Sequence, residues 1–100
     1  MLKNQLAGLG VMLLIGSGCA LTYQTDPQFQ NWLSQAEARC IPRYGALPLQ
    51  TDAQRNQFLN MTYRAYYHDL PREAYADRLK ILYPSSGLTV DCLASAMPRR

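Results

Sequence analysis

The first twenty residues of the chain have the three-part pattern of a secretory signal peptide. A short basic stretch that contains Lys3 is followed by an apolar run over residues 6–15, and the small residues Gly, Ser and Gly follow at 16–18. A run of this length is typical of a signal peptide and is short for a membrane-spanning helix, which needs about 20 apolar residues. The pattern therefore predicts that the remainder of the chain is exported.

Cys19 directly follows the small residues, and this arrangement resembles the lipobox of bacterial lipoproteins, although Gly16 stands where an aliphatic residue is usual. The resemblance implies that residues 1–18 are removed as a signal peptide. It also implies that Cys19 carries a diacylglyceryl thioether and an N-acyl chain such as palmitate, and several acyl chains together anchor a protein stably to a membrane. Residues 19–25 are then a lipidated tether, and residues 26–100 form the folded domain.

Two other interpretations of this segment stay open. An ordinary signal peptidase could cut after Ala20, with Gly18 and Ala20 as the small residues that it requires, and so release a soluble periplasmic protein. Alternatively, the segment stays uncut and serves as a short membrane anchor. In all three cases the rest of the chain lies in the cell envelope or outside the cell.

Export changes how the three cysteines of the chain are interpreted. If Cys19 is acylated or removed, Cys40 and Cys92 are left as a pair, and an oxidising compartment favours a disulfide between them. A domain of this size has a small core, and a crosslink that closes so long a loop stabilises it by about 4 kcal/mol. The sequence has no CxxC motif, so we expect a structural disulfide and no thiol redox chemistry.

The spacing of apolar residues predicts an all-α fold, a small bundle of three to four short helices tied by one disulfide. Apolar positions recur at steps of three and four in the segments 27–40, 51–70 and 71–83, which gives each segment one apolar face. The last segment, 87–97, is ambiguous. Val90, Leu93 and Met97 fit a short helix, whereas the Leu-Thr-Val sequence at its start could be extended.

Capping residues and helix breakers predict where these helices begin and end. Asp26 followed by Pro27 is a typical helix start, and Thr51 with Gln54 has the spacing of a capping box. Thr89 is the expected cap of the last helix. Proline and glycine pairs are expected to end the first and third helices, namely Pro42 with Gly45 and Pro84 with Gly87.

Charge and residue inventory argue against several function classes. The chain has 10 Lys and Arg against 7 Asp and Glu, with no long run of one sign, so no nucleic-acid partner is expected. The single histidine, His68, has Asp69 beside it, but neighbours on a helix point about 100° apart and do not pair. One histidine and two paired cysteines cannot supply a structural zinc site. We therefore expect no catalytic residues, no metal, no cofactor and no enzymatic activity.

The distinctive feature of the exported part is its tyrosines, which number seven in the whole chain. Helical periodicity places Tyr63 and Tyr66 toward the core and leaves Tyr67 exposed. Tyrosine and arginine anchor many protein–protein contacts because each buries a large area and keeps a polar tip. Tyr44, Arg64 and Tyr67 are therefore the candidate partner surface.

Together these features predict a small exported lipoprotein, anchored to a membrane of the cell envelope and facing the periplasm or the exterior. The disulfide-tied helical architecture is loosely similar to that of pilotins, which are small lipoproteins of secretion systems. The expected function is a protein-interaction module, accessory or pilot-like, that holds another envelope protein at the membrane. The alternatives are a soluble periplasmic protein, an envelope enzyme or ligand carrier with a site that the sequence does not reveal, and a stress- or mobile-element-associated lipoprotein with no defined activity.

Overall fold

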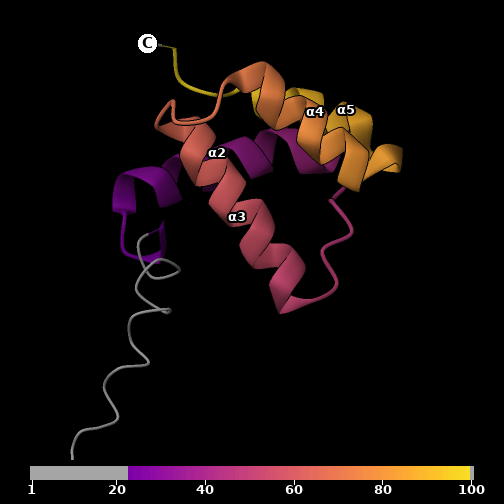
Figure 1. The fold of residues 1–100 in the computed structure, drawn as a ribbon, viewed down its shortest axis with the longest axis horizontal. Helices are drawn as coiled ribbons and strands as arrows, with labels where there is room; N and C mark the ends of the chain where they lie inside the picture. The colour runs from indigo at the N-terminus through magenta and orange to yellow at the C-terminus, as the bar shows by residue number, and fades with distance from the viewer. Residues whose placement is uncertain (1–22, 100) are drawn as a thin grey trace, which may run out of the picture.

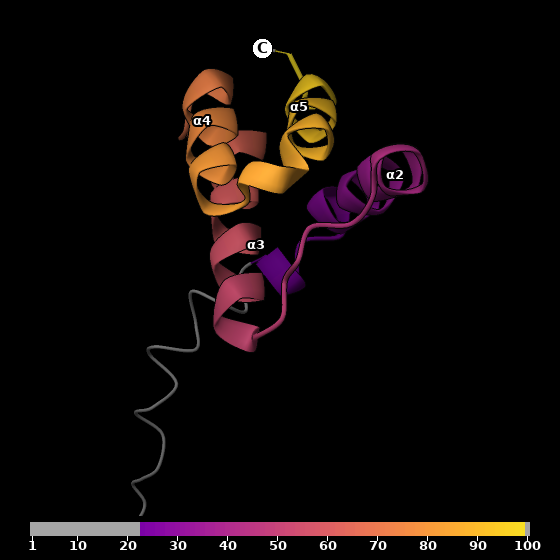
Figure 2. The same cartoon turned by 90° about the vertical axis from the view of Figure 1, so that its right-hand side faces the viewer.

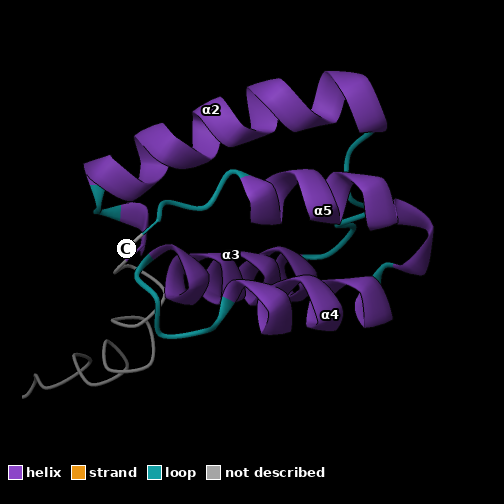
Figure 3. Ribbon diagram, turned by 90° about the horizontal axis from the view of Figure 1, so that it is seen from above, coloured by secondary structure: helices purple, strands orange, loops and turns teal. Residues whose placement is uncertain are grey.

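A computed structural model describes residues 23–99 as an all-α fold, as predicted. The order of elements is α2 (Pro27–Tyr44), α3 (Asp52–Tyr66), α4 (Arg72–Leu82), the short 3-10 helix η3 (Pro84–Ser86) and α5 (Gly87–Ser95), as Figure 1 shows. Helix α5 lies between α2 and α4, and α4 also packs on α3 (Figure 3). The last segment, which the sequence left ambiguous, is therefore helical.

Helix α2 begins as its sequence predicts but ends later. The carboxylate of Asp26 accepts the N–H of Phe29 at 3.0 Å, and Pro27 occupies the first helical position. Pro42 and Gly45 together were expected to end the helix; Pro42 lies inside it, and the helix continues to Tyr44. Proline removes one backbone bond and crowds the preceding turn, but so close to the C-terminus the helix loses little. Gly45, with a φ of 97°, closes the helix by donating its N–H to the Ile41 carbonyl at 2.8 Å.

Helix α3 has the predicted capping box and an unexpected C-terminus. Thr51 Oγ1 accepts the N–H of Gln54, and Gln54 Oε1 accepts the N–H of Thr51, both at 3.1 Å. At the other end the N–H of His68 reaches the Ala65 carbonyl, and the next N–H reaches the carbonyl of residue 64. This is a Schellman motif, in which His68 occupies the left-handed position, with φ 68°, that glycine usually fills.

Helix α5 begins two residues before its predicted cap. Gly87 was expected to be a stop after the third helix, but it is the first residue of α5, and η3 makes the turn from α4. Thr89 is not a cap. It lies inside the helix and is fully buried. Its hydroxyl donates to the Gly45 carbonyl at 2.7 Å across the interface with α2, and this bond allows the polar group to be buried.

The core combines the predicted apolar faces of α2, α3 and α5 with residues that periodicity did not select. Tyr23 and Tyr83 are buried, as is Thr62, whose hydroxyl bonds to the Phe58 carbonyl and to the Tyr75 hydroxyl. Burial raises the pKa of Tyr75 far above its usual value. The remaining buried apolar residues are Phe29, Leu33, Ala36, Cys40, Phe58, Leu59, Met61, Ala65, Tyr66, Leu70, Leu79, Val90, Leu93, Ala94 and Met97.

One predicted core row is only half correct. Helical periodicity over residues 71–83 places Tyr75, Leu79 and Leu82 on one face, with Ile81 beside them. Tyr75 and Leu79 are fully buried, but Leu82 is 42% exposed and Ile81 is 79% exposed. They lie in the last turn of α4, where the chain leaves the bundle toward η3, so no neighbouring helix covers them.

The described part of the molecule has two distinct ends, which lie at the left and the right of Figures 1 and 3; the right-hand end faces the viewer in Figure 2. Helix α2 begins at the proximal end, together with Tyr23, the α3–α4 connection (67–71) and the C-terminal residues 97–99. Helix α2 ends at the distal end, where η3 turns the chain from α4 into α5. These two names are kept below.

Candidate functional site

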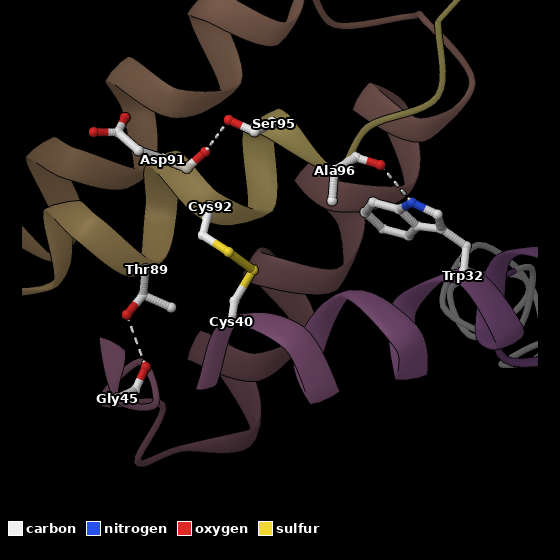
Figure 4. The surroundings of a disulfide bond; sticks show 8 residues. All are labelled: Trp32, Cys40, Gly45, Thr89, Asp91, Cys92, Ser95 and Ala96. Atoms are coloured by element: carbon white, nitrogen blue, oxygen red, sulfur yellow. Dashed lines mark hydrogen bonds between the residues drawn. A yellow bond between two sulfur atoms is a disulfide. The ribbon is translucent and has the colours of Figure 1, made fainter. Parts of the chain in front are cut away.

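The predicted disulfide is present and fastens α5 to α2. The sulfur atoms of Cys40 and Cys92 are 2.05 Å apart, and their Cα atoms are separated by 5.8 Å (Figure 4). Cys40 is fully buried and Cys92 is half-buried. The bond thus ties the first described helix to the last one, which suits a structural role better than exchange with an external thiol.

Two hydrogen bonds flank the disulfide and attach the same pair of helices. On one side the indole N–H of Trp32 donates to the Ala96 carbonyl at 2.8 Å, and on the other the Thr89 hydroxyl donates to the Gly45 carbonyl (Figure 4). Helix α5 is therefore held along its whole length.

At the proximal end, Asp26 forms a hydrogen-bonded cluster with Tyr63 of α3 and with Tyr67, the residue that follows α3. The Asp26 carboxylate accepts the Tyr67 hydroxyl at 2.5 Å and the Tyr63 hydroxyl at 3.2 Å, besides the N–H of Phe29. The bond from Tyr67 is the largest of the causes that lower the pKa of Asp26. The same bond raises the pKa of Tyr67 to about 12, and burial followed by the bond to Asp26 raises that of Tyr63.

Edge-on contacts between aromatic rings also fix the tyrosines of the cluster. The rings of Tyr63 and Phe29 meet nearly perpendicular, with centroids 5.0 Å apart, and those of Tyr66 and Tyr67 meet at 4.8 Å and 90°. The Tyr66 hydroxyl accepts the side-chain amide of Gln28 at 3.0 Å. The hydroxyls of Tyr63, Tyr66 and Tyr67 are each bonded to a residue at the start of α2, so the cluster holds that end of α2 against the C-terminal end of α3.

The tyrosines face as predicted, but the candidate partner surface is divided. Tyr66 is buried, Tyr63 is half-buried and Tyr67 is 40% exposed. Tyr67, with Arg64 one turn earlier on α3, lies at the proximal end, where it bonds to the cap of α2. Tyr44 is the last residue of α2, at the distal end, and has the Arg43 guanidinium 5.8 Å above its ring. The three residues therefore do not form one continuous patch.

The distal end carries an apolar surface that the sequence did not single out. Its members, here called the distal face, are the exposed side chains Tyr44 (42%), Ile81 (79%), Leu82 (42%) and Leu88 (68%). Tyr44 and Leu88 line one hollow of about 310 Å³ between α2 and α5, together with Arg39 and Asp91. Leu88 could have been recognised, because it falls outside the Val90, Leu93 and Met97 row and shares its helix face with polar residues.

Two further hollows flank the bundle. One of about 160 Å³ lies between α2, the 45–50 connection and α3, and is lined mainly by apolar side chains such as Leu47 and Phe58. A wider one of about 570 Å³ lies at the proximal end, between the α3–α4 connection and the C-terminal residues, and includes Arg72, Glu73 and Arg99. Within residues 23–99 no three His, Cys, Asp or Glu side chains gather in a way that could hold a metal ion.

Comparison with known proteins returned no matching family model, no matching curated protein and no matching solved structure. Among the helices in the described range, none has the length and hydropathy to cross a bilayer. The predicted signal peptide (1–18) and the lipid-accepting Cys19 lie outside the described residues.

Proposed function

We propose that this protein is a lipid-anchored interaction module of the cell envelope, which binds another envelope protein through its distal face. The observation that supports this most directly is that four large apolar side chains are exposed at one end of a small domain, and two of them, Tyr44 and Leu88, line a common hollow. Single exposed apolar residues are ordinary on protein surfaces, whereas contiguous groups of them mark interaction sites.

The make-up of the distal face suits a protein partner. Leucine, isoleucine and tyrosine provide apolar area, and the hollow beside Tyr44 and Leu88 also contains Arg39 and Asp91, which forms an ion pair with Lys80 at 2.7 Å. Interfaces combine such an apolar core with a polar rim. Because α5 is fastened to α2 by the disulfide, Tyr44 and Leu88 are held in a fixed relation before a partner binds, which lowers the entropy cost of association.

A photo-crosslinking experiment tests the distal face. A photoreactive phenylalanine derivative replaces Leu88 in the distal face, or Gln57 on the exposed side of α3 as the matched control. Irradiated envelopes are expected to yield one discrete protein adduct from position 88 and none from position 57. Adding Ile81→Asp should remove the adduct. An identical adduct pattern from both positions, or no adduct from position 88, contradicts the proposal.

The lipid anchor is tested separately. Cys19→Ser is expected to abolish acylation and to release the protein into the soluble periplasmic fraction. The intact mass of the wild-type protein should correspond to a chain that begins at Cys19 with its acyl chains. A mass that begins at Leu21 points instead to the soluble periplasmic alternative, and a full-length mass to an uncut anchor.

The size and openness of the three hollows give less support to the alternative that the protein carries a small ligand. Pockets for small organic ligands usually measure about 300–1,000 Å³ and enclose most of the ligand. The apolar hollow of about 160 Å³ is smaller than this, and the two wider ones lie open on the surface. Native mass spectrometry that found a co-purified small molecule of constant mass would favour this alternative.

A further inference from the structure

The folded domain begins closer to the proposed lipid than the sequence indicated. Tyr23 belongs to the expected tether (19–25), but it is only 2% exposed and is part of the core. Its hydroxyl donates to Asn56 Oδ1 at 3.0 Å, and its backbone carbonyl accepts the side-chain amide of Gln30 at 2.7 Å. The chain is therefore fixed to both α2 and α3 from Tyr23 onward.

This attachment limits how far the domain can move from an anchor at Cys19. Four residue steps join Cys19 to Tyr23, and a fully extended chain spans at most about 14 Å over them. Helix α2, with 18 residues, is about 27 Å long at 1.5 Å per residue. The four residue steps before Tyr23 can thus span at most about half the length of the helix that separates the proximal end from the distal end.

We propose that in the lipidated protein the proximal end rests on the phospholipid headgroups, and that the distal face is therefore directed away from the membrane. This inference depends on the proposed lipid anchor. The tether joins the domain at the proximal end, and its short reach brings that end, and not the far end of α2, to the bilayer surface.

The chemistry of the proximal end suits anionic headgroups. Tyr67 and Arg64 are exposed there, and tyrosine is enriched where proteins meet the headgroup layer. The wide proximal hollow brings together Arg72, Arg99 and the carboxylate of Glu73, and outside it the exposed Arg64 offsets the exposed carboxylate of Asp69. Guanidinium groups bind phosphate oxygens in a two-pronged geometry, so this hollow is suited to a phospholipid phosphate.

Site-specific quenching measures the orientation. Asp69→Cys places a thiol at the proximal end, and Ser85→Cys places one in η3 at the distal end; both positions are exposed. The native cysteines do not compete for the label, because Cys40 and Cys92 are joined. Each lipidated variant, labelled with a fluorophore, is reconstituted into phosphatidylglycerol-containing vesicles with a nitroxide on a fraction of the headgroups. We expect several-fold stronger quenching at position 69 than at position 85.

Two controls complete the test. A ten-residue Gly/Ser insertion after Ala20 should reduce the difference, because the longer tether frees the domain. Arg72→Gln with Arg99→Gln should weaken quenching at position 69, whereas the charge-matched pair Arg43→Gln with Arg78→Gln should not. Equal quenching at both positions, or stronger quenching at position 85, overturns the inference. A protein whose mass shows no acyl chain refutes the anchor itself, so the two failures are distinguishable.

Discussion

At the scale of single residues, the most informative position is Asp26. Its side chain caps α2 and also accepts hydrogen bonds from the hydroxyls of Tyr63 in α3 and of Tyr67 just after it. The sequence indicated the cap, because aspartate before proline is a local signal. It did not indicate the tyrosine bonds, because these join residues that are distant in the chain.

Because of the hydrogen bond between Asp26 and Tyr67, we expect the stability of the fold to decrease at both acid and alkaline pH. The pKa of Asp26 is lowered by folding, so its contribution to stability is present above about pH 4 and is lost as the pH falls through the folded-state value. The pKa of Tyr67 is raised to about 12, so its contribution is complete below about pH 10 and is lost as the pH rises toward 12.

Denaturant unfolding at a series of pH values checks both limits. The difference in stability between wild type and Asp26→Asn should shrink at acid pH, and that between wild type and Tyr67→Phe should shrink at alkaline pH. A difference that stays constant over the whole range would show that the hydrogen bond is not formed in solution.

The backbone conformation of His68 leads to a second prediction about stability at a single residue. Its φ of 68° is costly for a residue with a Cβ atom and most costly for a β-branched one. His68→Val should therefore unfold more easily than His68→Gly, by about 1–2 kcal/mol. Urea titration of the two variants measures this, and equal stability would place the helix end in another conformation.

At the scale of secondary structure elements, α5 is the helix that connects α2 to α4. It lies between α2 and α4 and is attached to α2 by the disulfide and by two hydrogen bonds. Its sequence is short and its Leu-Thr-Val start is also compatible with an extended strand, so its packing partners decided its conformation. Burial of a threonine hydroxyl in such a helix requires a specific acceptor.

Thr89→Val tests that attachment, because it keeps the shape and removes the hydroxyl that bonds to the Gly45 carbonyl. The expected loss is about 1 kcal/mol of unfolding free energy, the usual net contribution of such a bond. Ser95→Ala is the control, since its exposed hydroxyl donates to the carbonyl of Asp91 within the same helix and should matter little. An unchanged Thr89→Val stability would mean that water replaces the bond.

At the scale of the whole molecule, the disulfide closes a loop of 52 residue steps that contains most of the bundle. Its removal should lower the unfolding free energy by about 4 kcal/mol, since the unfolded chain regains the freedom that the crosslink denies it. Cys40→Ser is the variant, with the reduced wild-type protein for comparison.

Two measurements check this prediction. The melting temperature of Cys40→Ser should fall, and Cys92 should become reactive toward an alkylating reagent, whereas it should be inert in the wild type. A native protein in which Cys92 is already alkylated would lack the crosslink.

The candidate surface was predictable in part. Tyr67 is exposed, as helical periodicity indicated, and Tyr44 is exposed as well. Leu88 and Ile81 were not recognised, and Tyr44 and Tyr67 are at opposite ends of α2. Exposure of a single residue follows from its own helix. Proximity of two residues on different helices follows from how those helices cross, and no local pattern encodes that.

What the sequence by itself determined is local or covalent. The starts of α2 and α3 follow from capping residues, the buried faces of these helices follow from a period of 3.6 residues, and the cysteine pair follows from counting thiols in an exported chain. The tertiary structure alone decided that Tyr23 joins the core, that the end of α4 stays exposed, and that the apolar distal face is separate from the tyrosine cluster. The physical reason is that burial depends on which neighbour covers a face, and in so small a bundle some apolar faces have no neighbour.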